Sequence, residues 1–487
     1  IARQNTTHLV NECQAGKSRR REWLDLTGDL WFNRFLKPRQ QARSGALDMK
    51  RLNRYGFFFI IVIALCPACQ KQTDVPKHVF FIVIGTLRPD HLGCYGYSVP
   101  TSPTIDRLAR EGVVFTNAYA TSSNTLESVF SFFNCSTALT NNVHVHTPAE
   151  IKFISAGSVQ KYLKRAGYRT LAVISNPWLK AYQDYFQDGF NHVKFVGSKS
   201  WGIPNTTDLV TGTVSDFLTT KLDRKGKNFF FIYYLDPHDP YRSPVDYGFF
   251  SGELPRKAPS IHELSGEDEL RVRLKAEPDY SGLPTPGTLS QNDLDYMVSQ
   301  YDGEIRYVDA HIEKLIDKLR AMKILDDSLI IITSDHGEEF LDNGLFKHGF
   351  QLYDSSIRIP LIFYWKDHLA PQSKDAVVSG MDMPPTILAA CGLDVPAAML
   401  GSDIFQKNGE EPIPFCTHYV NQYQRGMRMG KWKLIENVST DEMMLFDMAS
   451  DPGEKNNLFT DPHAPREELL KSYKRLLAKH VIRKNVK

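Results

Sequence analysis

Short apolar runs that alternate with helical patterns constrain the fold of this chain more than any other feature. His78–Ile84 and Asn228–Leu235 are apolar along almost their whole length, as expected of strands buried on both faces of a parallel sheet. Amphipathic patterns at Asp208–Leu222 and Asn292–Met322 have helical spacing, and the second leads into another apolar run at 330–333. This alternation predicts an α/β domain with a largely parallel sheet flanked by helices.

The same alternation continues up to about residue 375. Further predicted elements are helices at Thr104–Glu111 and Ser158–Ala166 and strands at Thr170–Ile174 and Pro360–Trp365. Beyond it the segments shorten, to Arg428–Ile435, Met444–Asp447 and a helix at Pro465–His480. We therefore expect one large domain at 78–375 and a small α+β C-terminal subdomain at 376–487. The segment Phe249–Leu289, rich in proline, glycine and charge, is expected to be a long surface excursion.

Charge and cysteine content exclude some classes of protein. The 58 Lys and Arg residues nearly balance the 56 Asp and Glu residues, for a net charge of +2, so a nucleic-acid partner is not expected. The seven cysteines are scattered and form neither a disulfide framework nor a zinc-ribbon spacing.

Residues 49–69 have the layout of a secretory signal peptide. A basic stretch (Met49–Arg54) precedes an apolar one (Phe57–Leu65), which is shorter than the roughly 20 residues needed to span a bilayer. The ending Ala68-Cys69 resembles a bacterial lipobox, so we expect an exported lipoprotein anchored to the cell envelope, periplasmic or on the outer surface. A buried hairpin or a short membrane anchor is the alternative. The expected order is an upstream extension (1–48, with translation starting at Met49), signal peptide and lipobox (49–69) and polar tether (70–77).

The apolar run at 330–333 stops at Ser334-Asp335-His336-Gly337. Open α/β sheets place their chemistry at the carboxyl ends of strands, and a carboxylate beside an imidazole suits a divalent cation. His348, twelve positions after His336, follows a glycine-containing turn and could fold back to the same place. The alternative is a helix N-terminus with Asp335 as its cap.

Several short motifs, in this order, resemble the sulfatase family of the alkaline-phosphatase superfamily. They are Thr86–Tyr97, Pro103–Gly112, Asp236–Tyr241, Tyr301–Asp309, Asp335–Gly337, Arg358–Ile362, Met383–Leu388 and Leu445–Asp447 with Asp451-Pro452. The resemblance spans His78 to Leu458. It implies a large mixed, mostly parallel sheet flanked by helices, a small C-terminal domain with an antiparallel sheet, and metal-assisted hydrolysis of a sulfuric or phosphoric ester.

The resemblance also implies roles for individual residues. Thr125 matches the nucleophile position, at the start of a helix where the helix dipole favours an oxyanion. Thr125, Asp335 and His336 would hold one divalent metal ion. His238 and His348 would bind the oxyanion or protonate the leaving group. Arg88 would be a nearby positive or structural group. For His238 the alternative is a buried turn histidine held by a hydrogen bond.

Around Thr125 the sequence departs from the sulfatase pattern. Thr125–Val129 stands in place of the Cys/Ser-x-Pro-x-Arg motif that is converted to formylglycine, so no formylglycine is expected. Thr followed by x-x-Ser-Val resembles the phosphoethanolamine transferase branch. That branch also has a histidine twelve positions past the Asp-His pair, as His348 stands here. It has another before x-Pro-x-Tyr, which His238 in His238-Asp239-Pro240-Tyr241 matches roughly.

A second departure concerns the metal. Gly85 stands where the family's first strand ends with an acidic ligand, so that water, Asp90 or Asp236 would have to substitute, or the site is weak or inactive. Oxygen ligands favour calcium (or magnesium), while the histidines favour zinc or manganese. The expected function is hydrolysis of a small-molecule, glycan or lipid ester. The alternative is a catalytically impaired binding or scaffold lipoprotein.

Overall fold

The computed structural model describes residues 74–137, 139, 157–197, 206–252, 290–419 and 422–482. The predicted extension and the signal peptide with its lipobox lie outside the described residues, as does most of the excursion predicted at Phe249–Leu289. Within the described ranges, no helix is both long and apolar enough to cross a membrane.

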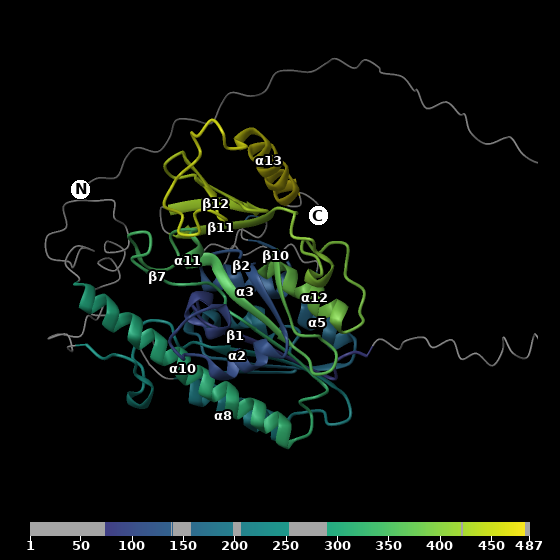
Figure 1. Ribbon diagram of the computed structural model, residues 1–487. Coiled ribbons are helices and arrows are strands. Elements are labelled where there is room, and N and C mark those ends of the chain that lie inside the picture. The colour runs from purple at the N-terminus through teal and green to yellow at the C-terminus, as the bar shows by residue number, and fades with distance from the viewer. Residues whose placement is uncertain are drawn as a thin grey trace, which may run out of the picture. The chain divides into compact units, whose positions relative to one another are not determined.

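An eight-stranded sheet forms the centre of the large domain, in the order β10-β2-β9-β6-β1-β5-β3-β4 (Figure 1). Its strands are β1 His78–Ile84, β2 Val113–Tyr119, β3 Tyr168–Ile174, β4 His192–Phe195, β5 Lys227–Tyr234, β6 Ser328–Thr333, β9 Arg358–Tyr364 and β10 Gln372–Ser379. Strand β9 runs antiparallel to both of its neighbours, β6 and β2, and every other pair is parallel. The mixed, mostly parallel sheet is therefore confirmed.

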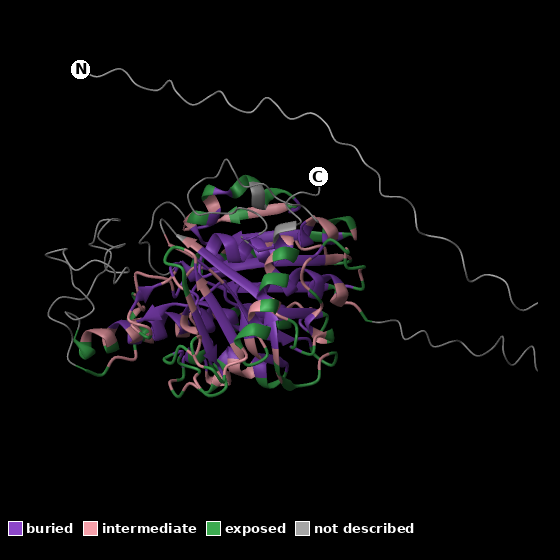
Figure 2. Cartoon of the chain, turned by 90° about the horizontal axis from the view of Figure 1, so that it is seen from above, coloured by how far each residue is buried: buried purple, intermediate pink, exposed green. Residues whose placement is uncertain are grey.

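Helices cover both faces of this sheet, because successive side chains of its central strands point to opposite faces. Along β1, Val79, Phe81 and Val83 pack on one side and Phe80, Ile82 and Ile84 on the other. The first side is covered by α3 (Thr125–Asn134), α5 (Val159–Arg165) and α12 (Met383–Ala390), the second by α2 (Pro103–Arg110), α8 (Thr207–Thr220) and α10 (Gln291–Ala321). Figure 2 shows the buried strands between these layers. Shorter elements are α6 Pro177–Ala181, α7 Gln183–Gln187, α11 Asp354–Ile357, β7 Glu339–Phe340 and β8 Phe346–Lys347.

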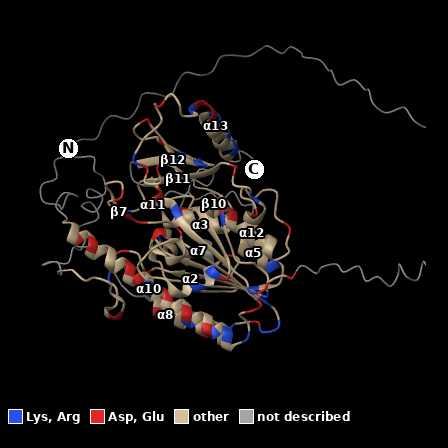
Figure 3. Ribbon diagram, viewed as in Figure 1, with Lys and Arg blue, Asp and Glu red and all other residues tan. Residues whose placement is uncertain are grey.

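A second, antiparallel sheet carries the C-terminal part. Its strands are β11 Ile413–Tyr419, β12 Gln422–Met429, β13 Trp432–Asn437 and β14 Glu442–Asp447, with α13 (Arg466–Ile482) packed against them. The boundary expected at residue 375 falls inside β10, a strand of the large sheet. The segment predicted at Arg428–Ile435 is the end of β12 and the start of β13, because the chain turns at Gly430 (φ +53°). Figure 3 shows acidic and basic residues mixed along α10 and α13.

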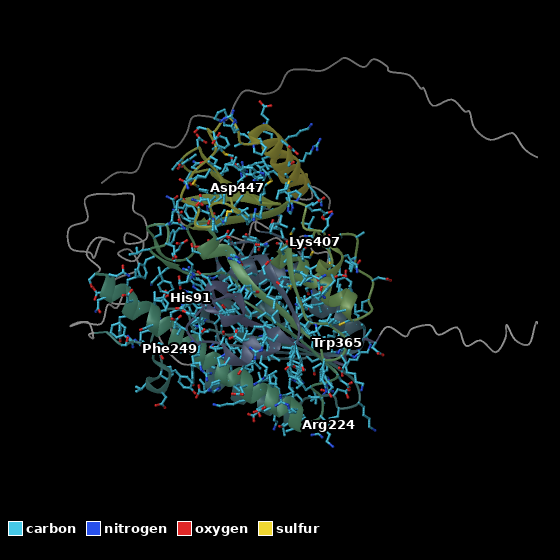
Figure 4. All side chains as sticks on the ribbon, in the orientation of Figure 1. His91, Arg224, Phe249, Trp365, Lys407 and Asp447 are labelled. Carbon is cyan, nitrogen blue, oxygen red and sulfur yellow. The ribbon has the colours of Figure 1, made fainter. Side chains whose placement is uncertain are left out.

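Residues of three of the motifs quoted above hold one another in place. His91, labelled in Figure 4, places Nδ1 2.7 Å from Oδ1 of Asp302 on α10, and the Tyr97 hydroxyl donates to the other oxygen of Asp302. Asp309, about two turns further along α10, accepts the N–H groups of Thr104 and Ile105 at the start of α2. These residues therefore fix the loop between β1 and α2.

Candidate active site

The loop after β6 delivers Asp335 and His336 to the carboxyl edge of the sheet. The short strand β7 follows this loop, so the alternative of a helix capped by Asp335 is excluded. Asp335 is fully buried, and Oδ1 accepts the backbone N–H groups of Thr86 (3.1 Å) and His336 (3.0 Å). Oδ2 accepts the hydroxyl of Tyr233, the penultimate residue of β5, at 2.8 Å. Protein donors therefore hold both oxygens of this carboxylate.

These contacts decide the protonation states of the two side chains. Burial alone would raise the pKa of Asp335, but His336, the Tyr233 hydroxyl and the Thr86 N–H outweigh it and hold that pKa below its usual value. Burial and the neighbouring Asp335 carboxylate raise the pKa of Tyr233 well above its usual value. Asp335 is accordingly ionised and Tyr233 is a neutral donor.

Thr125 and His336 form a hydroxyl–imidazole pair. Thr125 is the first residue of α3, and its Oγ1 lies 3.1 Å from Nε2 of His336. Nδ1 of His336 lies 2.9 Å from the carbonyl oxygen of Gly337, which can only accept a hydrogen bond. In the neutral imidazole Nδ1 therefore carries the proton, and Nε2 is left to accept one from Thr125.

The C-terminal sheet fixes the loop that leads into α3. Thr417 of β11 accepts hydrogen bonds from Ser123 Oγ and Asn124 Nδ2 and donates to the carbonyl of Gly349. The side chain of Asn124, the N-cap residue, accepts no hydrogen bond from the first N–H groups of α3, which lie beside the Thr125 hydroxyl. Uncapped N–H groups at a helix N-terminus favour an oxyanion. This part of the site was not predicted, because nothing in the sequence near 417 indicates it.

His348 and His238 lie beside this pair. The ring centroid of His348 is 4.3 Å from that of His336 and 5.0 Å from that of His238. Nδ1 of His348 lies 2.9 Å from Oε1 of Glu338, and Nδ1 of His238 lies 2.8 Å from the carbonyl oxygen of Asp239. The structure thus brings together Thr125 and the three histidines predicted for the site, and His238 is also bonded as the turn-histidine alternative describes.

Two charged residues that sequence reasoning did not single out support these histidines. Glu338 is fully buried, and burial raises its pKa to about 7, while the nearby His238 lowers it. Lys347, 1% exposed, pairs with Oδ2 of Asp239 at 2.8 Å. Glu338 follows the Asp335–Gly337 motif and Lys347 precedes His348, and their role follows only from the folded contacts.

Arg88 does not join the site. Its guanidinium makes five hydrogen bonds, two to the carboxylate of Asp90, two to that of Asp342 and one to the carbonyl of Glu338. An arginine has five N–H donors, and all are used. The structure therefore supports the structural alternative for Arg88 and leaves its predicted contact with substrate without support.

The donor atoms do not fit the divalent ion that the resemblance implied. Thr125, Asp335 and His336 lie together, but among the described residues no group of three or more His, Cys, Asp or Glu side chains is placed to hold a metal ion. Both proposed substitutes for the acid missing at position 85 are engaged by other residues. Asp90 is bound to Arg88, and Asp236 accepts both the N–H and the hydroxyl of Thr207.

Comparison with known proteins decides the family. The sulfatase family model matches residues 77–393, and the model described as N-sulphoglucosamine sulphohydrolase, C-terminal, matches residues 342–482. The chain belongs to the sulfatase family. This family comprises sulfuric ester hydrolases and generally uses a metal ion.

Individual relatives are distant but match over most of their length. The chain is 23% identical to the N-acetylglucosamine-6-O-sulfatase of Bacteroides thetaiotaomicron over 488 aligned positions, covering 82% of this chain and 85% of the relative. The phosphonate monoester hydrolase of Agrobacterium radiobacter superposes with a TM-score of 0.68 at 19% identity, over 83% of this chain and 96% of that one. A structure solved in complex with its substrate D-glucosamine-2-N,6-O-disulfate gives 0.64 at 20% identity, over 84% and 99%. These structural likenesses show the shared fold.

Proposed function

We propose that this protein cleaves a sulfuric or phosphoric ester with Thr125 as nucleophile and His336 as its general base. The observation that carries the proposal is the 3.1 Å contact between Thr125 Oγ1 and an Nε2 atom whose accepting state the Gly337 carbonyl determines. A hydroxyl paired with a base that is itself oriented by a third group is the arrangement of an activated nucleophile.

The proposed reaction has two steps. The Thr125 oxygen forms a bond to sulfur or phosphorus, its proton passes to His336 Nε2, and the bond from sulfur or phosphorus to the ester oxygen breaks. His348 or His238 supplies a proton to the departing alcohol. Water, or a second alcohol in a transfer reaction, then takes the group from Thr125 and restores its proton.

The helix N-terminus and the histidines of the site favour an anionic substrate. The N-terminus of α3, which its N-cap side chain leaves uncapped, and His336 with the adjacent His348 lie beside the Thr125 hydroxyl, where the non-bridging oxygens of a tetrahedral ester would lie. The relatives named above include a sulfatase of N-acetylglucosamine and a phosphonate monoester hydrolase. We therefore propose a sulfated sugar or a phosphoric ester as substrate. Anchoring to the cell envelope through Cys69 remains part of this proposal.

Turnover of defined esters tests it. The purified chain is assayed on 4-nitrophenyl sulfate, bis(4-nitrophenyl) phosphate and 6-O-sulfated N-acetylglucosamine, beside the Thr125→Ala variant. We expect turnover of at least one ester, and a loss of at least about a thousandfold in the variant with its melting temperature kept. An active Thr125→Ala variant would remove the mechanism.

The second candidate is a binding protein that has lost turnover. The absence of a side chain at Gly85 favours it, because it removes the expected acidic ligand. A wild-type chain that binds these esters in calorimetry but turns over none of them would establish this alternative.

A further inference from the structure

The Tyr233 hydroxyl occupies the space between position 85 and Asp335. It lies 2.8 Å from Oδ2 of Asp335, and a Cβ atom on Gly85 would lie 3.0 Å from the same hydroxyl. A cation bound jointly by Asp335 and a carboxylate at position 85 would have to lie where this hydroxyl is.

The contacts of Asp335 leave it no need for a cation. A buried carboxylate must be compensated, because the loss of hydration disfavours its charge. Here Oδ1 accepts two backbone N–H groups, from Thr86 and His336, and Oδ2 accepts the Tyr233 hydroxyl. These three hydrogen bonds, together with His336, whose Nε2 lies 3.4 Å from Oδ2, supply the compensation that a metal ion would otherwise supply.

Tyr233 is held firmly in this position. Its side chain is fully buried, and it pairs with Val83 of β1 in the centre of the sheet. Nδ2 of Asn176 lies 3.3 Å from its hydroxyl and donates to it, so the hydroxyl's own proton is directed at Asp335.

We propose that Tyr233 replaces the divalent ion of this site, so that the chain has no resident metal. Tyr233 is then a positioning residue, which holds the Asp335 carboxylate in place. Gly85 belongs to the same replacement. A side chain there would meet the Tyr233 hydroxyl at 3.0 Å and the Leu235 carbonyl at 3.1 Å. A side chain at position 85 and the Tyr233 hydroxyl would therefore compete for the same space.

The inference predicts that Gly85→Asp alone cannot rebuild a metal site, because the hydroxyl stands in the way. Removing the hydroxyl by Tyr233→Phe frees Oδ2 of Asp335, and adding Gly85→Asp then supplies a second carboxylate. Tyr234→Phe is the matched control, since the next tyrosine of β5 points to the opposite face and its hydroxyl lies 3.1 Å from Thr211 Oγ1.

The test measures bound metal in the full chain. Each variant is stripped with chelator, then titrated with Mn²⁺, Ca²⁺ and Zn²⁺ by calorimetry and analysed for metal by mass spectrometry after gel filtration. We expect far less than one ion per chain in the wild type, Gly85→Asp and Tyr234→Phe. Tyr233→Phe should bind at least about tenfold more tightly than the wild type, and Gly85→Asp/Tyr233→Phe should hold about one ion.

Two results would overturn the inference: about one ion of any of these metals in the wild type, or a folded Tyr233→Phe variant with no gain in affinity. Should the double variant not fold, Tyr233→Phe decides alone. The inference concerns the same site as the proposed function, but its measurement is independent of turnover. A metal-free and inert wild type upholds it while contradicting the proposed function, and a metal-loaded wild type overturns it whatever its activity.

Discussion

Oγ1 of Thr125 lies 3.1 Å from Nε2 of His336, although 211 positions of sequence separate them. The N-terminus of helix α3 supplies the hydroxyl and the loop after β6 supplies the imidazole, so the pair forms only because the fold brings these two segments together. Its consequences can be measured.

Because the two side chains act as a unit, their removal should not be additive. Thr125→Ala and His336→Gln are each expected to lower kcat/KM by at least about a hundredfold. The kcat/KM of the double variant should be no more than about tenfold below that of the less active single variant. The measurement is a double-mutant cycle in kcat/KM on the best ester. Losses that multiply fully would show that the two residues act separately.

His348 is expected to protonate the departing alcohol. Its Nδ1 is engaged by Glu338, and its ring lies beside that of His336, the partner of the nucleophile. A nitrophenolate leaves without a proton, whereas an alkyl alcohol does not. His348→Gln should therefore lower kcat about a hundredfold or more for alkyl esters and much less for nitrophenyl esters. Equal losses on both kinds of ester would assign His348 to oxyanion binding instead.

Arg88 should matter for stability and not for substrate binding. Its side chain is 7% exposed, while those of Asp90 and Asp342 are 55% and 33% exposed and can be partly hydrated when unpaired. We expect Arg88→Met to lower the free energy of unfolding by about 2 kcal/mol, below the range for fully buried pairs, with KM unchanged. Denaturant unfolding measures this.

A surface ion pair is the control for Arg88. Arg107 and Glu313 lie 3.5 Å apart with side chains 36% and 48% exposed, so Arg107→Met should change stability by less than about 0.5 kcal/mol. A KM that rises strongly in Arg88→Met while stability is kept would restore the predicted substrate contact.

Local sequence patterns predicted most of the large domain, because a strand buried on both faces must be apolar throughout. They did not predict that β9 runs antiparallel to β6 and β2, since strand direction depends on the connections and not on side-chain pattern. The hairpin at Gly430 was missed for a related reason. The apolar residues before and after the turn form one continuous strand pattern in the sequence.

The residues of the candidate site also divide into those that local motifs predicted and those that they did not. Thr125, His336, His348 and His238 stand in motifs and were predicted. Tyr233 was counted only as one apolar residue of a buried run, because nothing local distinguishes it from Tyr234. Its role depends on two other strands, β1 with Gly85 and β6 with the Asp335 loop. Long-range contacts of this kind carry no signal in a single sequence.

The last prediction concerns Glu127, which lies in the first turn of α3 close to the nucleophile. It is 2% exposed, the Ser122 hydroxyl donates to its Oε2, and its Oε1 has no hydrogen-bond partner among the described residues. Burial raises the pKa of Glu127 to about 8, although the Ser122 and Asn124 side chains lower it. The carboxyl is therefore protonated in the folded chain at pH 6 and ionised in the unfolded chain.

A raised pKa in the folded state fixes the sign of the pH effect. Between about pH 4.5 and pH 8 the folded state binds the extra proton, so stability from this group is full at low pH and is lost as pH rises through 8. Glu127→Gln keeps a neutral acceptor for Ser122 and cannot ionise. We expect the two proteins to agree within about 1 kcal/mol at pH 5, and the variant to become the more stable one as pH rises to 8.5. Urea unfolding at several pH values measures the difference, and a difference that stays constant from pH 5 to 8.5 would show that Glu127 is already ionised in the folded chain.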